Sequence, residues 1–238
     1  MTAVDVTNPS GRSGVLLLCE HASNALPARF GDLGLDDAAR VSHAAWDPGA
    51  LDLAKALSAA LDAPLVAGTV SRLVYDCNRP PEAESAMPTR SEVFDIPGNL
   101  GLTEAQRADR VAQVYAPFCG AVETLRPRTR VLVTVHSFTP IWHGQRRETE
   151  IGLLHDSDSR MVDAMLPHAP KDRVVHRNRP YGPEDGVTHS LKLHAVAHGL
   201  PNVMIEVRND LLTAPEAVAG IAADLMAMLT PALEAVHA

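Results

Sequence analysis

The sequence of 238 residues predicts a single α/β domain in three layers, with helices on both faces of a mainly parallel or mixed central sheet. Apolar runs at 15–19, 131–135 and 203–207 show no polar alternation, which is typical of parallel strands that are buried on both faces. Segments with helical periodicity separate these runs along the chain. Neither an internal repeat nor an inter-domain linker stands out, so we expect one domain over residues 1–238.

Each element of this fold has a local signal. Residues 1–12 are polar and contain Pro9 and Gly11, so we expect a flexible N-terminal segment. Asp36 and Thr103 are suited to cap helices, and Pro48 suits the first turn of another. Gly199 is suited to end a helix. The excursion at 81–99 is rich in Pro, Glu and Ser and predicts a lid or a binding loop.

From these signals we predict the elements in chain order. Strands are expected at 15–19, 64–70, 71–80, 130–138, 151–154 and 203–208. Helices are expected at 39–44, 50–61, 103–125, 159–166, 190–198 and 214–235. We expect none of these segments to be long enough to cross a membrane.

Composition excludes several classes of protein. A net charge of −8 argues against a nucleic-acid surface and against binding to an anionic membrane. The three cysteines form no CxxC pair, and no apolar leader precedes the first strand, so we expect a protein of the reducing cytoplasm. No glycine-rich phosphate-binding motif occurs, so no nucleotide cofactor is expected.

Two of the buried strands end in histidine, at His21 and His136. Adjacent parallel strands would bring both imidazoles to the carboxyl end of the sheet, where α/β proteins place their ligand sites. A catalytic zinc ion needs three protein ligands and one open position. Asp47 or Glu20 could supply the third ligand, and we favour Asp47 because Glu20 and His21 would point to opposite faces of an extended strand. The alternatives are a turn-forming cluster around His21 and a helix-capping role for Asp47.

A third buried strand carries the carboxylate of Glu206. An unpaired carboxylate there would be costly, so Glu206 is either a general base or the partner of a cation such as Arg208. Because Glu206 and Arg208 share one strand face, both could face the same cleft.

Polar residues on either side of Asp76 point to an acidic substrate. Arginine binds carboxylates through two parallel hydrogen bonds, which makes Arg72 and Arg79 candidates for substrate binding in an otherwise acidic protein. We add Asn78 and Ser137 to the candidate substrate-binding residues.

Five ordered blocks together resemble the N-formylglutamate amidohydrolase family. They are CEHASN at 19–24, AWDPGA at 45–50, SRL to DCNRP at 71–80, VHSFTP at 135–140 and IEVRNDL at 205–211. The resemblance implies a phosphorylase/hydrolase-like fold and hydrolysis of an N-formyl or N-acyl amide by a zinc enzyme. It further implies that His21 and His136 bind the metal and that Glu206 activates water, with Asp47 as our inferred third ligand.

The mechanism that we expect uses one zinc ion per chain to acidify a water molecule, with Glu206 moving the proton. Arg72 or Arg208 would stabilise the oxyanion, and Asn78 and Arg79 would hold the carboxylates of a small acidic N-acyl amino acid. Two alternatives remain: a peptide or muropeptide amidase with the same metal site, and a non-catalytic carboxylate-binding protein. The sequence does not determine the oligomeric state.

Overall fold

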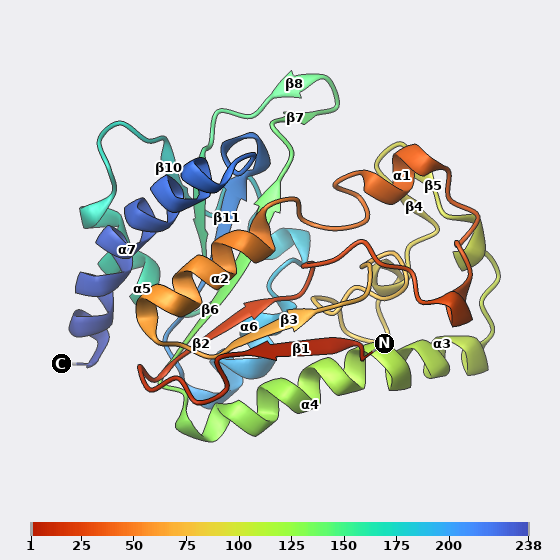
Figure 1. Ribbon diagram of the computed structural model, residues 1–238, viewed down its shortest axis with the longest axis horizontal. Coiled ribbons are helices and arrows are strands. Elements are labelled where there is room, and N and C mark those ends of the chain that lie inside the picture. The colour runs from red at the N-terminus through yellow and green to blue at the C-terminus, as the bar shows by residue number, and fades with distance from the viewer. Residues whose placement is uncertain (1, 238) are drawn as a thin grey trace.

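A seven-stranded mixed sheet forms the centre of the protein in our computed structural model, which describes residues 2–237 (Figure 1). Its strands, in spatial order, are β1 (Val4–Thr7), β3 (Leu65–Gly68), β2 (Val15–Cys19), β6 (Val131–Phe138), β11 (Asn202–Arg208), β9 (Ile151–Leu154) and β10 (Val175–Arg177). The three strands β2, β6 and β11 are parallel neighbours at the centre. Strand β1 pairs antiparallel with β3, and β9 pairs antiparallel with β11. The predicted α/β domain with a mainly parallel sheet is therefore confirmed.

Helices cover both faces of the sheet and complete the three predicted layers. One face packs against α2 (Ala50–Leu61), α5 (Arg160–Met165) and α7 (Pro215–His237); the other packs against α4 (Ala116–Leu125) and α6 (His189–His194) (Figure 1). Alternation along β2 shows how one strand supplies both cores: Leu17 belongs to the first core and Leu16 to the second. Both leucines are completely buried, as the unbroken apolar run predicts.

The helix caps predicted at Asp36 and Thr103 are confirmed, whereas Pro48 precedes the Gly49 N-cap and lies outside α2. Asp36 accepts a hydrogen bond from the Ala39 amide at the start of α1 (Asp37–Val41). Thr103 forms a capping box with Gln106 at the start of α3 (Glu104–Arg110). A π-helical turn, η4 (Val111–Tyr115), joins α3 to α4 just before Pro117. The missing amide of proline removes one helical hydrogen bond, and the wider turn accommodates this change without ending the helix.

Three predictions are corrected. The N-terminal segment is not flexible over Val4–Thr7, because β1 forms backbone pairs with β3. Residues 71–80 are turns and irregular chain instead of a strand, since the Ser71 and Asp76 side chains bond local backbone amides. By length and composition α7 could cross a membrane, contrary to expectation, but its apolar side packs against α2 and α5 in the first core.

The loop that leads into α2 depends on Gly49. Its φ of 80° lies in the left-handed region, and a Cβ there would lie 2.4 Å from the Cβ of Leu212. We expect Gly49→Ala to lower the free energy of unfolding by more than about 1–2 kcal/mol, measured by urea denaturation. Gly120→Ala is the control, because a Cβ there meets nothing within 4 Å, and it should stabilise α4 by roughly 0.5–1 kcal/mol.

Candidate metal centre and active site

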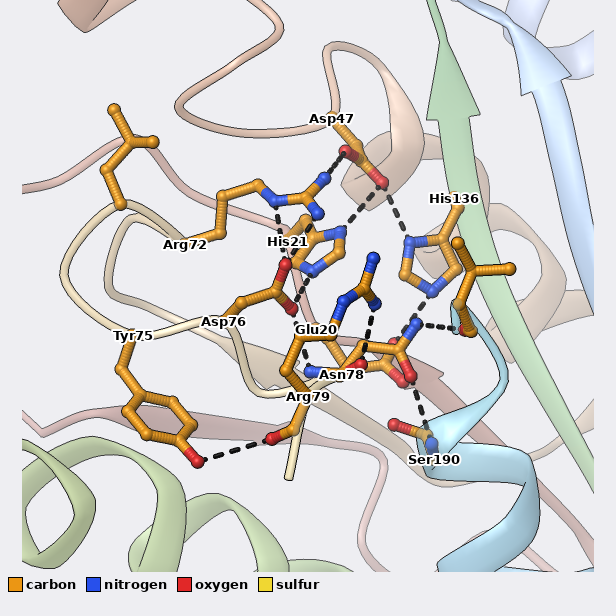
Figure 2. A network of polar contacts seen from close by, with 12 residues as sticks. Glu20, His21, Asp47, Arg72, Tyr75, Asp76, Asn78, Arg79, His136 and Ser190 are labelled. Atoms are coloured by element: carbon orange, nitrogen blue, oxygen red, sulfur yellow. Dashed lines mark hydrogen bonds and ion pairs between the residues drawn. The ribbon is translucent and has the colours of Figure 1, made fainter. Parts of the chain in front are cut away.

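His21, Asp47 and His136 meet at the carboxyl end of the central strands. His21 lies just beyond β2, His136 lies in β6, and Asp47 lies in the loop before α2. The Nδ1 atoms of His21 and His136 lie 3.3 Å and 2.8 Å from the same oxygen, Oδ2 of Asp47 (Figure 2). All three side chains are buried, and one ligand atom from each lies within 4.8 Å of the others. The structure thus brings the three predicted metal ligands together.

Backbone contacts of the Asp47 loop fix this arrangement. The Asp47 amide donates a hydrogen bond to the His21 carbonyl at 2.9 Å, and the Ser137 amide donates to the Asp47 carboxylate at 3.3 Å. The Ser137 hydroxyl donates to the Pro48 carbonyl at 2.7 Å. Asp47 does not cap α2, because Gly49 occupies the N-cap position. Ser137, expected to bind substrate, holds the Asp47 loop in place.

The Nε2 atoms of the two histidines each face a second carboxylate. Asp76 lies 2.7 Å from Nε2 of His21, and Glu20 lies 3.2 Å from Nε2 of His136 (Figure 2). Metal-binding histidines commonly hold a carboxylate on the ring nitrogen that is not bound to the metal, which fixes the tautomer and the ring orientation. Glu20 is therefore a partner of His136 and lies outside the trio of candidate metal ligands, His21, Asp47 and His136. Strand alternation is not the cause of this separation between Glu20 and His21, because β2 ends at Cys19, before either residue.

Removing the charge of Glu20 tests this arrangement. We expect Glu20→Gln to weaken metal binding about 10- to 100-fold, since the amide orients His136 less strongly than the carboxylate does. Competition with a metal-binding dye would measure the change. An unchanged affinity would mean that Glu20 does not support His136.

The electrostatics of the cluster favour a cation. Four buried carboxylates lie near the imidazoles, those of Glu20, Asp47, Asp76 and Glu206. The guanidinium groups of Arg72 and Arg79 add positive charge to the same region. Burial alone would lower the pKa of His136, but Glu20 and Asp47 outweigh it and raise this pKa well above its usual value. Two imidazoles and one carboxylate form a donor set that suits Zn²⁺ and leaves a position open. The residues present therefore fit a catalytic metal.

Glu206 lies beside this trio on the neighbouring strand. It is in register with His136 across the β6–β11 ladder and lines the same cavity, of about 170 Å³. Its Oε2 atom is buried and has no hydrogen-bond partner among the described residues. Burial, reinforced by the charge of Asp47 and opposed by both histidines, raises the pKa of Glu206 to about 7. An unpaired carboxylate with such a pKa is suited to proton transfer.

The predicted substrate-binding residues of the 71–80 segment differ in how far contacts within the protein already occupy their side chains. Arg72 donates to Asp76 from Nε and Nη2 and reaches Oδ1 of Asp47 at 3.6 Å from Nη1, so it orients two carboxylates of the cluster. Asn78 donates to the Val187 carbonyl and accepts from the Ser190 amide, so both ends of its amide are engaged. Arg79 lines the cavity, and within residues 2–237 the one hydrogen bond that its guanidinium donates goes to the Asn78 carbonyl.

Arg208 does not reach the cavity. Its Nε donates to Asp210 at 2.8 Å, and its Nη1 donates to the Arg147 carbonyl at 3.1 Å. A shared strand face predicts that Glu206 and Arg208 line one cleft, and this prediction is wrong for Arg208. Arg208 is the last residue of β11, and its side chain turns toward Asp210 and the Arg147 carbonyl. The alternative of a Glu206–Arg208 ion pair is also excluded by this arrangement, since Arg208 approaches Glu150 and Asp210 instead.

Comparisons with known proteins identify the family of the chain. The sequence profile of the N-formylglutamate amidohydrolase family matches residues 13–213. The chain belongs to that family. The matched range includes His21, Asp47, His136 and Glu206, and the family is one of hydrolases.

Solved structures of two relatives share the family fold. A crystal structure of a gene product from Agrobacterium tumefaciens is 51% identical, covers 100% of this chain and 97% of its own, and superposes with a TM-score of 0.97. The N-formylglutamate amidohydrolase of Ralstonia eutropha is 19% identical, with coverage of 100% and 99% and a TM-score of 0.69, and it supports the fold alone. No curated protein matches the chain.

Proposed function

We propose that this protein is a metal-dependent amidohydrolase that removes an N-formyl or N-acyl group from a small acidic amino acid, with one zinc ion per chain. The observation that carries the proposal is the His21–Asp47–His136 trio with the unpaired carboxylate of Glu206 in the same cavity. When bound, the metal would supply an acidified water and polarise the amide carbonyl.

The residues of the chain would have separate roles in this reaction. Glu206 accepts a proton from the attacking water and delivers it to the departing amine. Arg72, held over the cavity by Asp76 and Asp47, stabilises negative charge on the former carbonyl oxygen. Arg79 binds a carboxylate of the substrate, and Asn78 positions Arg79 by fixing the loop against Val187 and Ser190.

A panel of N-formyl, N-acetyl and peptidyl amides of glutamate, assayed with and without added Zn²⁺, tests the proposal. We expect metal-dependent hydrolysis that is fastest for an acidic N-acyl amino acid. Hydrolysis of peptidyl substrates alone would favour the peptide or muropeptide amidase. Tight binding of glutamate derivatives without hydrolysis, even with added metal, would favour the carboxylate-binding protein.

A further inference from the structure

A second, larger cavity opens outward from the metal cavity. It has a volume of about 690 Å³, and we call it the outer chamber. Arg79, Trp142, Tyr181 and Val187 line both cavities, so the two spaces adjoin one another along these side chains. The metal cavity, which we call the inner cavity, measures about 170 Å³, so the outer chamber offers additional space for a ligand larger than a single amino acid.

Arg147 lines the outer chamber, where aromatic side chains hold its guanidinium. It follows the hairpin of β7 (Ile141–Trp142) and β8 (Gln145–Arg146), and its guanidinium carbon lies 5.4, 5.0 and 4.8 Å from the ring centroids of Phe138, Trp142 and Tyr181. Cation–π contacts of this kind hold a guanidinium in place without using its hydrogen-bond donors. The hydrogen bond from Nη1 to the Thr139 carbonyl, at 3.3 Å, uses one of five donors.

This guanidinium lacks the carboxylate partner that Arg72 and Arg208 have. Arg72 pairs with Asp76, and Arg208 pairs with Asp210. Within residues 2–237, no side-chain carboxylate lies within 4.0 Å of a guanidinium nitrogen of Arg147. A positioned arginine with free donors at the wall of a cavity is suited to bind a carboxylate from a ligand.

The outer chamber also reverses the charge of the protein locally. Three arginines line it, Arg79, Arg147 and Arg179, against the carboxylates of Glu148 and Asp185. The whole chain carries a net charge of −8. Since most of the surface repels anions, this positive lining directs an anionic group toward the entrance of the metal cavity.

We propose that the outer chamber is a second carboxylate subsite, in which Arg147 binds an anionic extension of the amide substrate. The extension lies beyond the single amino acid held in the inner cavity and is either a carboxylate at the far end of the acyl group or an acidic residue joined to the amino acid. This proposal rests on the proposed amidohydrolase function and narrows its substrates to amides with an additional, distant carboxylate.

Two pairs of substrates test the proposal and distinguish the two sources of the carboxylate. N-succinylglutamate is compared with its terminal succinamide analogue, and N-formyl-Glu-Glu is compared with N-formyl-Glu-Gln. In at least one pair we expect the charged member to have a kcat/KM at least tenfold higher, mainly through KM, because a charge-assisted double hydrogen bond is lost with the amide. The pair that shows the preference identifies the source.

Variants of two neighbouring arginines provide the matched comparison. Arg147→Gln should abolish the preference, and Arg147→Lys should retain part of it because the charge remains. Arg146→Gln is the control, since Arg146 is exposed and does not line the chamber, and it should leave the preference unchanged. Equal kcat/KM values within both pairs, or a preference that survives in Arg147→Gln, would overturn the proposal.

A binding measurement separates this proposal from the proposed function. Trp142 lines the outer chamber, so its fluorescence should report on binding of N-succinylglutamate, with Trp142→Phe as the background that retains Trp46. Arg147→Gln should raise the Kd at least tenfold relative to the wild type and to Arg146→Gln. If this holds while no amide is hydrolysed, the subsite stands and the hydrolase function fails. An unchanged Kd contradicts the subsite even if N-formylglutamate is hydrolysed.

Discussion

Replacing Glu206 by glutamine should lower kcat by about 10²- to 10⁴-fold while the protein keeps its metal. Glutamine has nearly the same shape as glutamate but cannot accept a proton from water. Because Glu206 lies outside the His21–Asp47–His136 trio, its loss leaves all three ligands in place. Steady-state kinetics and elemental analysis of the same preparation measure both quantities.

A carboxylate outside the cavity gives the matched control for this variant. Glu150 approaches Arg208 at 3.7 Å and does not line the metal cavity, so Glu150→Gln should leave kcat close to the wild-type value. Near-normal turnover in Glu206→Gln would remove Glu206 from the mechanism. Loss of metal together with turnover would show that Glu206 is a ligand instead of a base.

The pH dependence of the wild-type enzyme provides an independent measurement of the same group. Burial raises the pKa of Glu206 to about 7, and only the ionised carboxylate can accept a proton. The value of kcat/KM should therefore fall as the pH is lowered through this pKa. A metal ion in the trio favours the ionised form and moves this limb to lower pH. A kcat/KM profile with no fall on the acid side would contradict the role of Glu206 as base.

The sequence predicted the positions of site residues correctly where these residues lie at the ends of buried strands. Unbroken apolar runs predicted β2, β6 and β11, and the polar residues at or near their carboxyl ends, His21, His136 and Glu206, do line one cavity. Parallel neighbours leave little freedom at this edge of a sheet, so the spatial cluster follows from the topology.

Residues on loops were less predictable, because turn chemistry and tertiary contacts decide their conformation. The alternation at 71–80 is the pattern of a strand, but Ser71 and Asp76 bond the local backbone and form turns. This segment places Asp76 against His21, a contact 55 positions apart in the chain that no local pattern encodes. For Arg208 the strand was predicted correctly, but the contact of the side chain was not. Because β11 ends at Arg208, the side chain turns to Asp210 instead of following Glu206 into the cavity.

Replacing either histidine of the trio by alanine should remove the metal. We expect about one zinc ion per chain in the wild type, and less than a tenth of that in His21→Ala and in His136→Ala, with activity lost in parallel. Two remaining ligands hold a metal much more weakly than three. Each deletion also removes an imidazole from a buried carboxylate: His21→Ala from Asp76, which keeps Arg72, and His136→Ala from Glu20. Elemental analysis by mass spectrometry after dialysis measures the content.

His43→Ala distinguishes loss of a ligand from general damage to the cavity. His43 lines the same cavity but pairs with Glu92 at 2.7 Å and lies outside the trio, so this variant should keep its zinc. Metal affinity of the wild type should also fall as the pH is lowered, because Glu20 and Asp47 raise the pKa of His136 and the protonated imidazole cannot bind a metal. A wild-type protein that binds no metal after zinc is added would overturn the hydrolase mechanism. Measurable binding of glutamate derivatives by the same preparation would then support the carboxylate-binding alternative.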